Sequence, residues 1–273
     1  MKPNTELHGE YQVQALDRTF AILDVLARSN QLLGPTELGK RLNLHRSTVH
    51  RLLAVLERHR YVERDTQTAK YRLGLKLVEL SSFALPQFEF ERSAKPYVEK
   101  LAAETGEAAH MGILCSGEVM SILHAAGSNE ANSPSTVGRR SPIHCTSLGK
   151  AILAFRKEAN ELILSHRFVM HTKKTITNSA QFSAELDKVR VRGIAIDDEE
   201  FQEGLRCIGA PVCDRAGRAI AAISIAGPRS RISNDRSIEL ARAVLAISRA
   251  LSEAVAKTGE GVGDRFEISR TGV

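Results

Sequence analysis

The sequence predicts an α+β protein with a small, mainly helical domain at the N-terminus and a larger domain built on an antiparallel sheet. The chain has 273 residues, which is more than one typical domain needs. Its first eighty residues repeat apolar side chains at helical spacing, whereas the later part alternates helical stretches with apolar runs that turns connect. Strands joined in hairpins favour an antiparallel sheet over a doubly wound parallel one.

The composition excludes several classes of protein. Hydrophobic residues make up 42% of the chain, and no stretch is long and apolar enough to cross a membrane. Residues 1–10 are polar and contain no apolar signal segment, so we expect a cytoplasmic protein without a membrane partner. Scattered cysteines without a C-x-x-C pair predict free thiols and neither a metal site nor a cofactor; they are Cys115, Cys145, Cys207 and Cys213.

Positive charge is concentrated in one segment. Between residues 36 and 76 there are ten Lys or Arg and four Asp or Glu. The net charge of this segment alone therefore equals the formal net charge of the whole chain, +6. A local basic segment in an otherwise neutral chain favours binding to a polyanion. A solvated basic surface would give the same count, so the pattern within the segment has to decide.

Two helices are predicted before the most basic part. Residues 12–29 form an amphipathic helix, and Leu32 to Pro35 ends it. Thr36 is expected to cap the next short helix, whose buried face carries Leu38 and Leu42, and residues 43–45 form a turn. The apolar stripe of the first helix consists of Val13, Leu16, Phe20 and Leu23.

The helix predicted over residues 46–58 combines a buried stripe with a polar face. The buried stripe has apolar residues at i, i+3, i+4 and i+7, namely Val49, Leu52, Leu53 and Leu56. A short helix, a tight turn and then a helix with exposed arginines is the arrangement that reads the major groove of DNA. An ordinary surface helix would also be polar outside, so this helix alone leaves both interpretations open. The exposed face collects Arg46, Ser47, His50, Arg51, Ala54 and Arg58.

A predicted β-hairpin directly after this helix favours the DNA interpretation. Residues 61–64 and 70–73 are strand-like, and the polar residues 65–68 lie between them. A hairpin in this place is the wing of a winged helix-turn-helix, and its basic return strand suits the sugar-phosphate backbone. The residues expected to contact double-stranded DNA are Thr36, Arg46, Ser47, Thr48, His50, Arg51, Lys70, Tyr71 and Arg72.

The C-terminal part predicts strands mixed with helices. Apolar runs at residues 108–115 and 119–125 form one hairpin, and further runs follow at 193–196, 205–212 and 219–225. Helical stretches are predicted at residues 89–104, 147–155, 159–164, 180–192 and 235–256.

Several segments resemble the IclR family of bacterial transcriptional regulators. In the N-terminal part these are residues 15–18, 44–53 and 71–74. In the C-terminal part they are residues 138–151, 193–200 and 204–212, although Cys213 stands where the family usually has an aromatic residue or His. The resemblance spans about residues 13–251 and follows the same order along the chain.

The resemblance implies a domain organisation and a function. It implies a winged helix-turn-helix at residues 12–74, a linker helix at 75–86 and a GAF-like effector-binding domain at 87–257, followed by a flexible tail at 258–273. The protein would be a dimer or tetramer that binds a palindromic operator, controls a catabolic operon and senses a small organic or sugar acid. The effector-binding residues implied at matching positions are Ser147, Leu148, Asp197, Leu205, Cys207 and Ser224.

Three other interpretations of the sequence are possible. Residues 147–150 fit S-x-x-K and residues 257–259 fit K-T-G, as in serine acyl transferases, but the second motif follows a long helix where that fold needs a core strand. Four consecutive acids at residues 197–200 could bind a divalent cation, yet neighbouring strand residues point to opposite faces; a loop with Asp197 inward is expected instead. The third alternative is a DNA-binding structural protein without a ligand.

Overall fold

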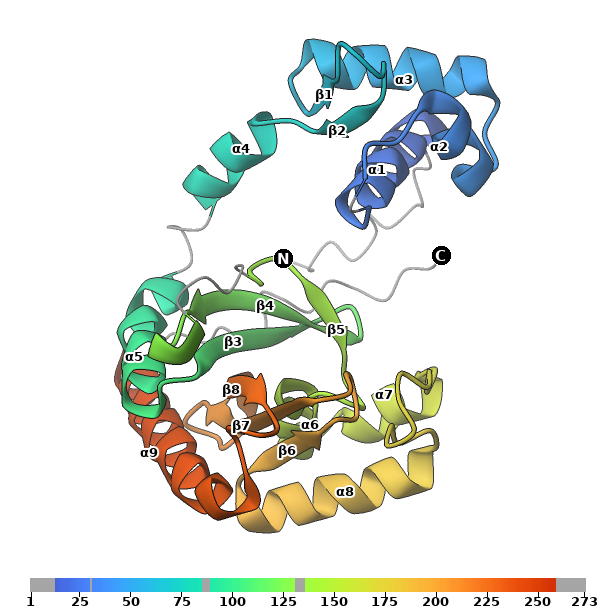
Figure 1. Cartoon of the computed structure of the whole chain (residues 1–273). Coiled ribbons are helices and arrows are strands. Elements are labelled where there is room, and N and C mark those ends of the chain that lie inside the picture. The colour runs from blue at the N-terminus through green and yellow to red at the C-terminus, as the bar shows by residue number, and fades with distance from the viewer. Residues whose placement is uncertain (1–12, 30, 85–88, 131–135, 259–273) are drawn as a thin grey trace, which may run out of the picture. The chain divides into compact units, whose positions relative to one another are not determined.

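The computed structural model describes residues 13–29, 31–84, 89–130 and 136–258 (Figure 1). The chain divides into two compact units, and the division lies between residues 87 and 88. Each unit has its own hydrophobic core, so each is described by itself.

The N-terminal unit packs three helices against a two-stranded hairpin. The helices are α1 (Gln14–Ala27), α2 (Pro35–Leu42) and α3 (Arg46–Arg58), and the antiparallel strands are β1 (Val62–Arg64) and β2 (Tyr71–Leu73). Helix α4 (Lys76–Ala84) follows. The core lies between α1, α2, α3 and the hairpin, where Val49, Leu53 and Leu56 of α3 are buried. This arrangement confirms the predicted winged helix-turn-helix.

Two expectations for this unit are wrong. Thr36 does not cap α2, because the cap residue is Gly34, whose N–H donates to the Glu37 carboxylate at 2.7 Å. Tyr71 does not lie on the outer surface of the wing, because its side chain is 5% exposed and belongs to the core. Alternation along β2 turns Tyr71 inward and Arg72 outward. Tyr71 therefore leaves the set of residues that could contact DNA.

The C-terminal unit contains one antiparallel sheet of six strands in the order β5-β4-β3-β8-β7-β6. The long central strands are β3 (Ala108–Cys115), β4 (Glu118–Ala125), β7 (Leu205–Cys213) and β8 (Ala219–Pro228). The short edge strands are β5 (Arg140–Pro142) and β6 (Ala195–Asp198). The predicted antiparallel sheet is confirmed, although β5 was not predicted because three residues carry too little periodicity.

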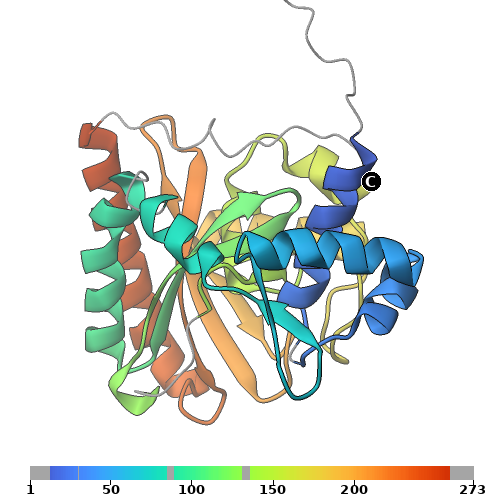
Figure 2. The ribbon, with the colours of Figure 1, turned by 90° about the horizontal axis from the view of Figure 1, so that it is seen from above.

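Helices cover both faces of this sheet (Figure 2). Helices α5 (Glu89–Thr105) and α9 (Asn234–Thr258) pack side by side over one face and enclose the larger core. Helix α6 (Ser147–Ala154) packs on the other face against β7 and β8, with α7 (Ala159–Ser165) and α8 (Ser179–Arg192) outside it. A short 3₁₀ turn, Ser128–Glu130, follows β4.

Glycines allow α6 to lie very close to the chain beneath it. A Cβ atom on Gly149 would come within 2.3 Å of the Ile143 carbonyl oxygen, and one on Gly209 of β7 would come within 3.1 Å of the Ser147 backbone. No larger side chain fits at Gly149 without a shift of the backbone. The N-terminus of α6 is thereby fixed directly over β7.

The predicted elements differ from the structure mainly at their ends. The strand expected at residues 193–196 begins two residues later, because Gly193 adopts a left-handed conformation (φ 68°) and ends α8. Lys257 and Thr258 lie in the last turn of α9 and not on a strand, so the K-T-G match has the wrong context for an acyl transferase. Most of the predicted tail, residues 259–273, and the end of the predicted linker lie outside the described residues.

Candidate functional site

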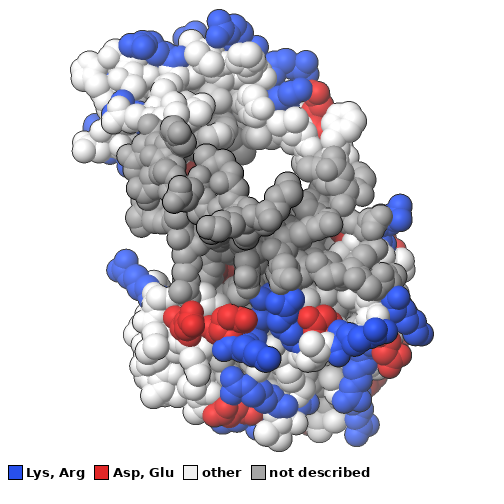
Figure 3. Space-filling model, turned by 180° about the vertical axis from the view of Figure 1, so that it is seen from behind, with Lys and Arg blue, Asp and Glu red and all other residues white. Residues whose placement is uncertain are grey.

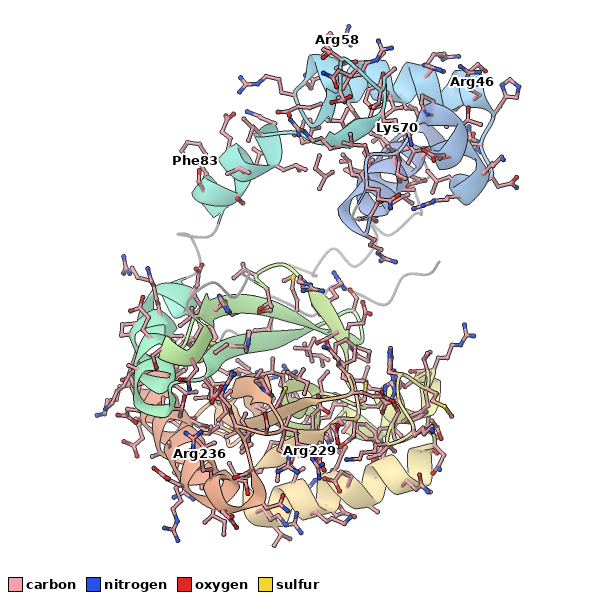
Figure 4. The ribbon with its side chains drawn as sticks, in the orientation of Figure 1. Arg46, Arg58, Lys70, Phe83, Arg229 and Arg236 are labelled. Carbon is pink, nitrogen blue, oxygen red and sulfur yellow. The ribbon has the colours of Figure 1, made fainter. Side chains whose placement is uncertain are left out.

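The exposed face of α3 is rich in basic and polar side chains. Arg46, Arg51 and Arg58 are exposed, and in the described part of the chain no carboxylate forms an ion pair with them. Figure 3 shows Lys and Arg along the outer edge of this unit, and Figure 4 shows Arg46 and Arg58 at opposite ends of α3. At the first turn, the Nδ1 atom of His45 lies 2.7 Å from the Ser47 hydroxyl. The basic face predicted from the sequence is thus free to meet a polyanion.

The basic side chains of the wing already have partners. The Lys70 ammonium lies 3.5 Å from the Glu37 carboxylate, and the Arg72 guanidinium lies 3.0 Å from Glu63 on the opposite strand. Exposed ion pairs of this kind contribute only about 0–1 kcal/mol, so a phosphate can replace the carboxylate at little cost. The basic side chains of the wing are therefore paired with carboxylates, whereas the exposed arginines of α3 have no such partner among the described residues.

The six implied effector residues lie together around the N-terminus of α6. Asp197 of β6 pairs with Cys207 of β7, and Ser224 of β8 pairs with Gly209, which faces Ser147. One face of β7 carries Leu205, Cys207 and Gly209, because residues two positions apart on a strand point to the same side. Leu148 lies over β3, where a Cβ on Gly112 would come within 3.1 Å of its side chain. The structure therefore brings these residues to one face of the sheet, which we call the α6 face.

The start of α6 supplies hydrogen-bond donors to this face. Thr146 caps the helix through a 3.2 Å bond from the Gly149 N–H to its hydroxyl, so Ser147 is the first helical residue and not the cap. The first N–H groups of a helix have no acceptor within the helix and carry partial positive charge. The N–H groups of Ser147 and Leu148 are therefore suited to an anionic oxygen.

Asp197 lies on a strand rather than in the loop we expected, and it is 1% exposed. One of its carboxyl oxygens accepts the Glu200 N–H at 2.8 Å. Burial, reinforced by the nearby Glu200 carboxyl, raises the pKa of Asp197 to about 7. Burial, and then the Asp197 carboxyl, raise the pKa of the Cys207 thiol well above its usual value. Asp197 can thus accept or donate a hydrogen bond near neutral pH.

Lys150 is the functional residue that sequence reasoning missed. Its side chain is completely buried, and its ammonium donates to the Ile196 carbonyl and to the Glu200 carboxylate, the latter at 2.6 Å. These bonds join α6 to β6 and to the segment that follows it. The only local signal is that Lys150 directly precedes the apolar residues Ala151 to Phe155, and its place in an S-x-x-K match favours a different chemistry.

The four consecutive acids do not converge on one cation site. Asp198 lies 2.8 Å from Arg206 and 3.1 Å from Arg229, which Figure 4 labels, and Glu199 lies 2.6 Å from Lys174. Glu200 pairs with Lys150, and Asp197 points into the α6 face. Asp198 and Glu199 share the cations Lys174 and Arg229, whereas the other two acids lie on the buried side, so the four carboxylates do not surround one ion.

One group among the described residues has side chains that could hold a metal ion. His144, Cys145 and His171 each offer a ligand atom, and these atoms lie within 4.8 Å of one another. However, Nε2 of His144 donates to the Val169 carbonyl at 3.0 Å, and Nδ1 accepts from His166 at 2.7 Å. Burial also raises the pKa of the Cys145 thiol to about 12. Because a metal ion would have to displace these partners, we assign no metal here.

Comparison with known proteins identifies the family. The family model described as "Bacterial transcriptional regulator IclR C-terminal" matches residues 82–253, and the "IclR helix-turn-helix domain" matches residues 15–66. The chain belongs to the IclR family. It is 35% identical to the HTH-type transcriptional regulator XynR of Escherichia coli, with 88% of this chain and 97% of XynR covered. It is also 35% identical to the regulator KdgR of Dickeya chrysanthemi, with 88% and 79% covered.

Solved structures of the IclR family share the fold. The Thermotoga maritima IclR is 28% identical, with a TM-score of 0.70 over 90% of this chain and 100% of that one. An IclR homologue from Microbacterium hydrocarbonoxydans, solved with 4-hydroxybenzoate, is 22% identical, with a TM-score of 0.72 over 88% and 99%. The protein is accordingly a DNA-binding, ligand-responsive transcriptional regulator of the IclR family. None of its described helices could span a bilayer.

The raised pKa of Asp197 predicts how stability changes with pH. Asp197 titrates near pH 4 in the unfolded chain and near pH 7 in the folded protein. Between these values the folded state keeps a proton that the unfolded state has lost, so the free energy of unfolding falls as pH rises. The wild type should therefore lose about 1.4 kcal/mol per pH unit relative to Asp197→Asn, measured by urea unfolding from pH 5 to 7. Asp187→Asn, which changes an exposed acid of α8, is the control. If the free energy of unfolding depends on pH in the same way for wild type and Asp197→Asn, the raised pKa assigned to Asp197 is wrong.

Proposed function

We propose that this regulator controls a catabolic operon by binding a palindromic operator as a homo-oligomer in the cytoplasm, and that a small organic acid changes this binding. The observation that carries the proposal is the gathering of Asp197, Cys207 and Ser224 on the α6 face, beside the N–H groups of Ser147 and Leu148. The ligand of the Microbacterium homologue, 4-hydroxybenzoate, is itself an organic acid.

We assign recognition of the DNA bases to α3 and contacts with the DNA phosphates to the wing. The N-terminal turn of α3 presents Arg46, Ser47, Thr48, His50 and Arg51. Arginine pairs with the guanine edge in the major groove, whereas Lys70 and Arg72 suit phosphates. Thr36 stays in the proposed set as a residue of the first turn of α2. The DNA-binding domain would cover residues 12–74, the linker helix 75–86 and the effector domain 87–257.

Exposed apolar side chains on α1 and α4 support the proposed homo-oligomer. The core of the N-terminal unit uses Ile22 and Leu26 of α1, which leaves Leu16 and Phe20 exposed, Phe20 by 60%. Phe83 of α4, labelled in Figure 4, is 68% exposed. Large apolar side chains that gather on a surface usually mark a site that another protein surface covers. A second copy is the proposed partner, because one winged helix reads too short a DNA segment for specificity.

Substitutions in α3 and in the wing should have different effects on DNA binding. Replacing a base-reading arginine, Arg46→Ala or Arg51→Ala, should cost about 1–3 kcal/mol and relax sequence preference at one position. Lys70→Ala or Arg72→Ala should weaken binding to all sequences alike and lower the salt slope by about one. Fluorescence anisotropy with operator variants over a salt series measures both effects. If neither α3 arginine changes operator binding, the assignment of α3 is wrong.

Asp197→Ala should abolish the response to the effector and leave operator binding near normal. An effector acts only through its different affinities for two conformations, so the loss of a pocket contact removes the response and not the DNA-binding surface. A thermal-shift screen of organic acids, with 4-hydroxybenzoate among them, supplies the ligand, and electrophoretic mobility shift measures the response. Asp187→Ala, which removes an exposed acid of the same unit, is the control. A mutant that responds like wild type would remove Asp197 from the pocket, and one that cannot bind DNA would make it a structural residue.

A further inference from the structure

The polar residues of the α6 face are closed off from solvent in this structure. Ser147, Asp197 and Ser224 are exposed by only 2%, 1% and 3%. A small molecule can therefore reach them only if a segment that covers them moves. Helix α6 is fixed by its close approach to β7 and by the bonds of Lys150, and β7 and β8 are fixed by their ladder of hydrogen bonds. The moving segment is therefore expected among the loops.

The segment that connects α7 to α8, residues 166–178, covers one side of this face; we call it the α7–α8 loop (Figure 1). The ring centre of His171 lies 5.2 Å from that of Phe201, whose N–H donates to the Asp197 carboxyl at 3.3 Å. A ring nitrogen of His171 also lies within 4.8 Å of the Cys145 sulfur, which belongs to a fully buried residue. Burial, and then the nearby Asp197 carboxyl, raise the pKa of Cys145. Cys145 and Asp197 thus lie together beneath this loop.

The α7–α8 loop joins the hydrophobic core only near its two ends. At one end the ring centre of Phe168 lies 5.8 Å from that of Phe182, and at the other end Ile176 packs against the same core cluster. Between them, residues 169–175, all of which the structure describes, add no side chain to a core cluster, and Met170 is 68% exposed. Burial of apolar surface, the main favourable contribution to folding, therefore does not hold the middle of the loop in place.

Hydrogen bonds hold the middle of the loop against its neighbours on two sides. The Thr172 hydroxyl donates to the Glu199 carbonyl at 2.7 Å. The Thr175 hydroxyl donates to the Glu200 carbonyl, also at 2.7 Å. On the side of α6, Nε2 of His144 donates to a carbonyl of the loop at 3.0 Å. Each bond contributes little net stability, because water takes its place when the loop opens. The middle of the loop can therefore open while the core stays folded.

We propose that the α7–α8 loop is a lid over the α6 face, and that its opening at residues 169–175 admits small molecules to the buried residues beneath. This inference rests on the proposed function, because that function places the effector at this face. It adds a conformational step to effector binding: the effector enters and leaves only while the loop is open, so the rate of binding depends on the fraction of molecules in the open state.

Alkylation of Cys145 in the full-length protein tests the inference. Iodoacetamide, a small uncharged reagent, reacts with a buried thiol only while it is uncovered, and mass spectrometry of peptides measures each cysteine separately. Thr172→Val and Thr175→Val, which each remove one hydroxyl bond, should raise the rate at Cys145 by about tenfold. Cys115, buried at the end of β3, should keep its wild-type rate in the same sample. Thr177→Val, which changes an exposed threonine of the same loop, is the matched control and should react like wild type.

Two results would overturn the inference. One is a wild-type rate at Cys145 in the folded variants, and the other is an equal rise at Cys115, because the whole unit would then be loosened. If a valine variant does not fold, the wild-type protein decides in low concentrations of urea. The rate at Cys145 should then rise less steeply with urea than the rate at Cys115, because opening a loop exposes less surface than unfolding the domain. Equal slopes would show that no lid opens by itself.

The inference and the proposed function can fail separately. The labelling rates do not depend on the effector. If the valine variants react as expected but no organic acid in the thermal-shift screen stabilises the protein, the lid stands and the proposed response to an acid is wrong. If an acid stabilises the protein but Cys145 reacts at the same rate in all folded variants, the proposed function stands and the lid is wrong.

Discussion

The arrangement of the α6 face depends on the hydrogen bonds that the buried Lys150 ammonium makes. Lys150 bonds to the Ile196 carbonyl and to the Glu200 carboxylate, and so fixes α6 against β6 and the segment after it. A buried charge is tolerated only when it is paired and hydrogen-bonded. Thr172 and Thr175 complete the arrangement, because their hydroxyls donate to the carbonyl groups of Glu199 and Glu200 at 2.7 Å each.

The position of Asp197 follows from this constraint. Since Lys150 is occupied by Glu200, Asp197 relies on backbone N–H groups and titrates near pH 7. One side of the α6 face is therefore charged or easily charged, whereas its other side, at His110, is neutral and polar. The close approach of α6, which Gly149 and Gly209 permit, brings its N–H groups to the charged side.

The sequence predicted what short-range patterns determine. The periodicity of α3 and the alternation in the long strands depend on neighbours within a few residues, and both elements were found where expected. Lys150 and Glu200 are fifty residues apart, so nothing local indicates their contact. The pairing of His110 with Ser224 was missed for the same reason, since the register of β3 on β8 appears only in the folded sheet. Tyr71 is different: alternation with Lys70 and Arg72 could have shown that it points inward.

A double-mutant cycle on Lys150 and Glu200 tests the central claim most directly. Urea unfolding gives the free energy of unfolding for wild type, Lys150→Met, Glu200→Gln and the double variant at pH 7. Removing one partner of a buried pair should cost about 3–5 kcal/mol, because an unpaired charge remains inside the protein. The double variant should recover most of this loss, since neither charge remains. Additive losses would show that the two side chains do not interact, and the account of the α6 face would then be wrong.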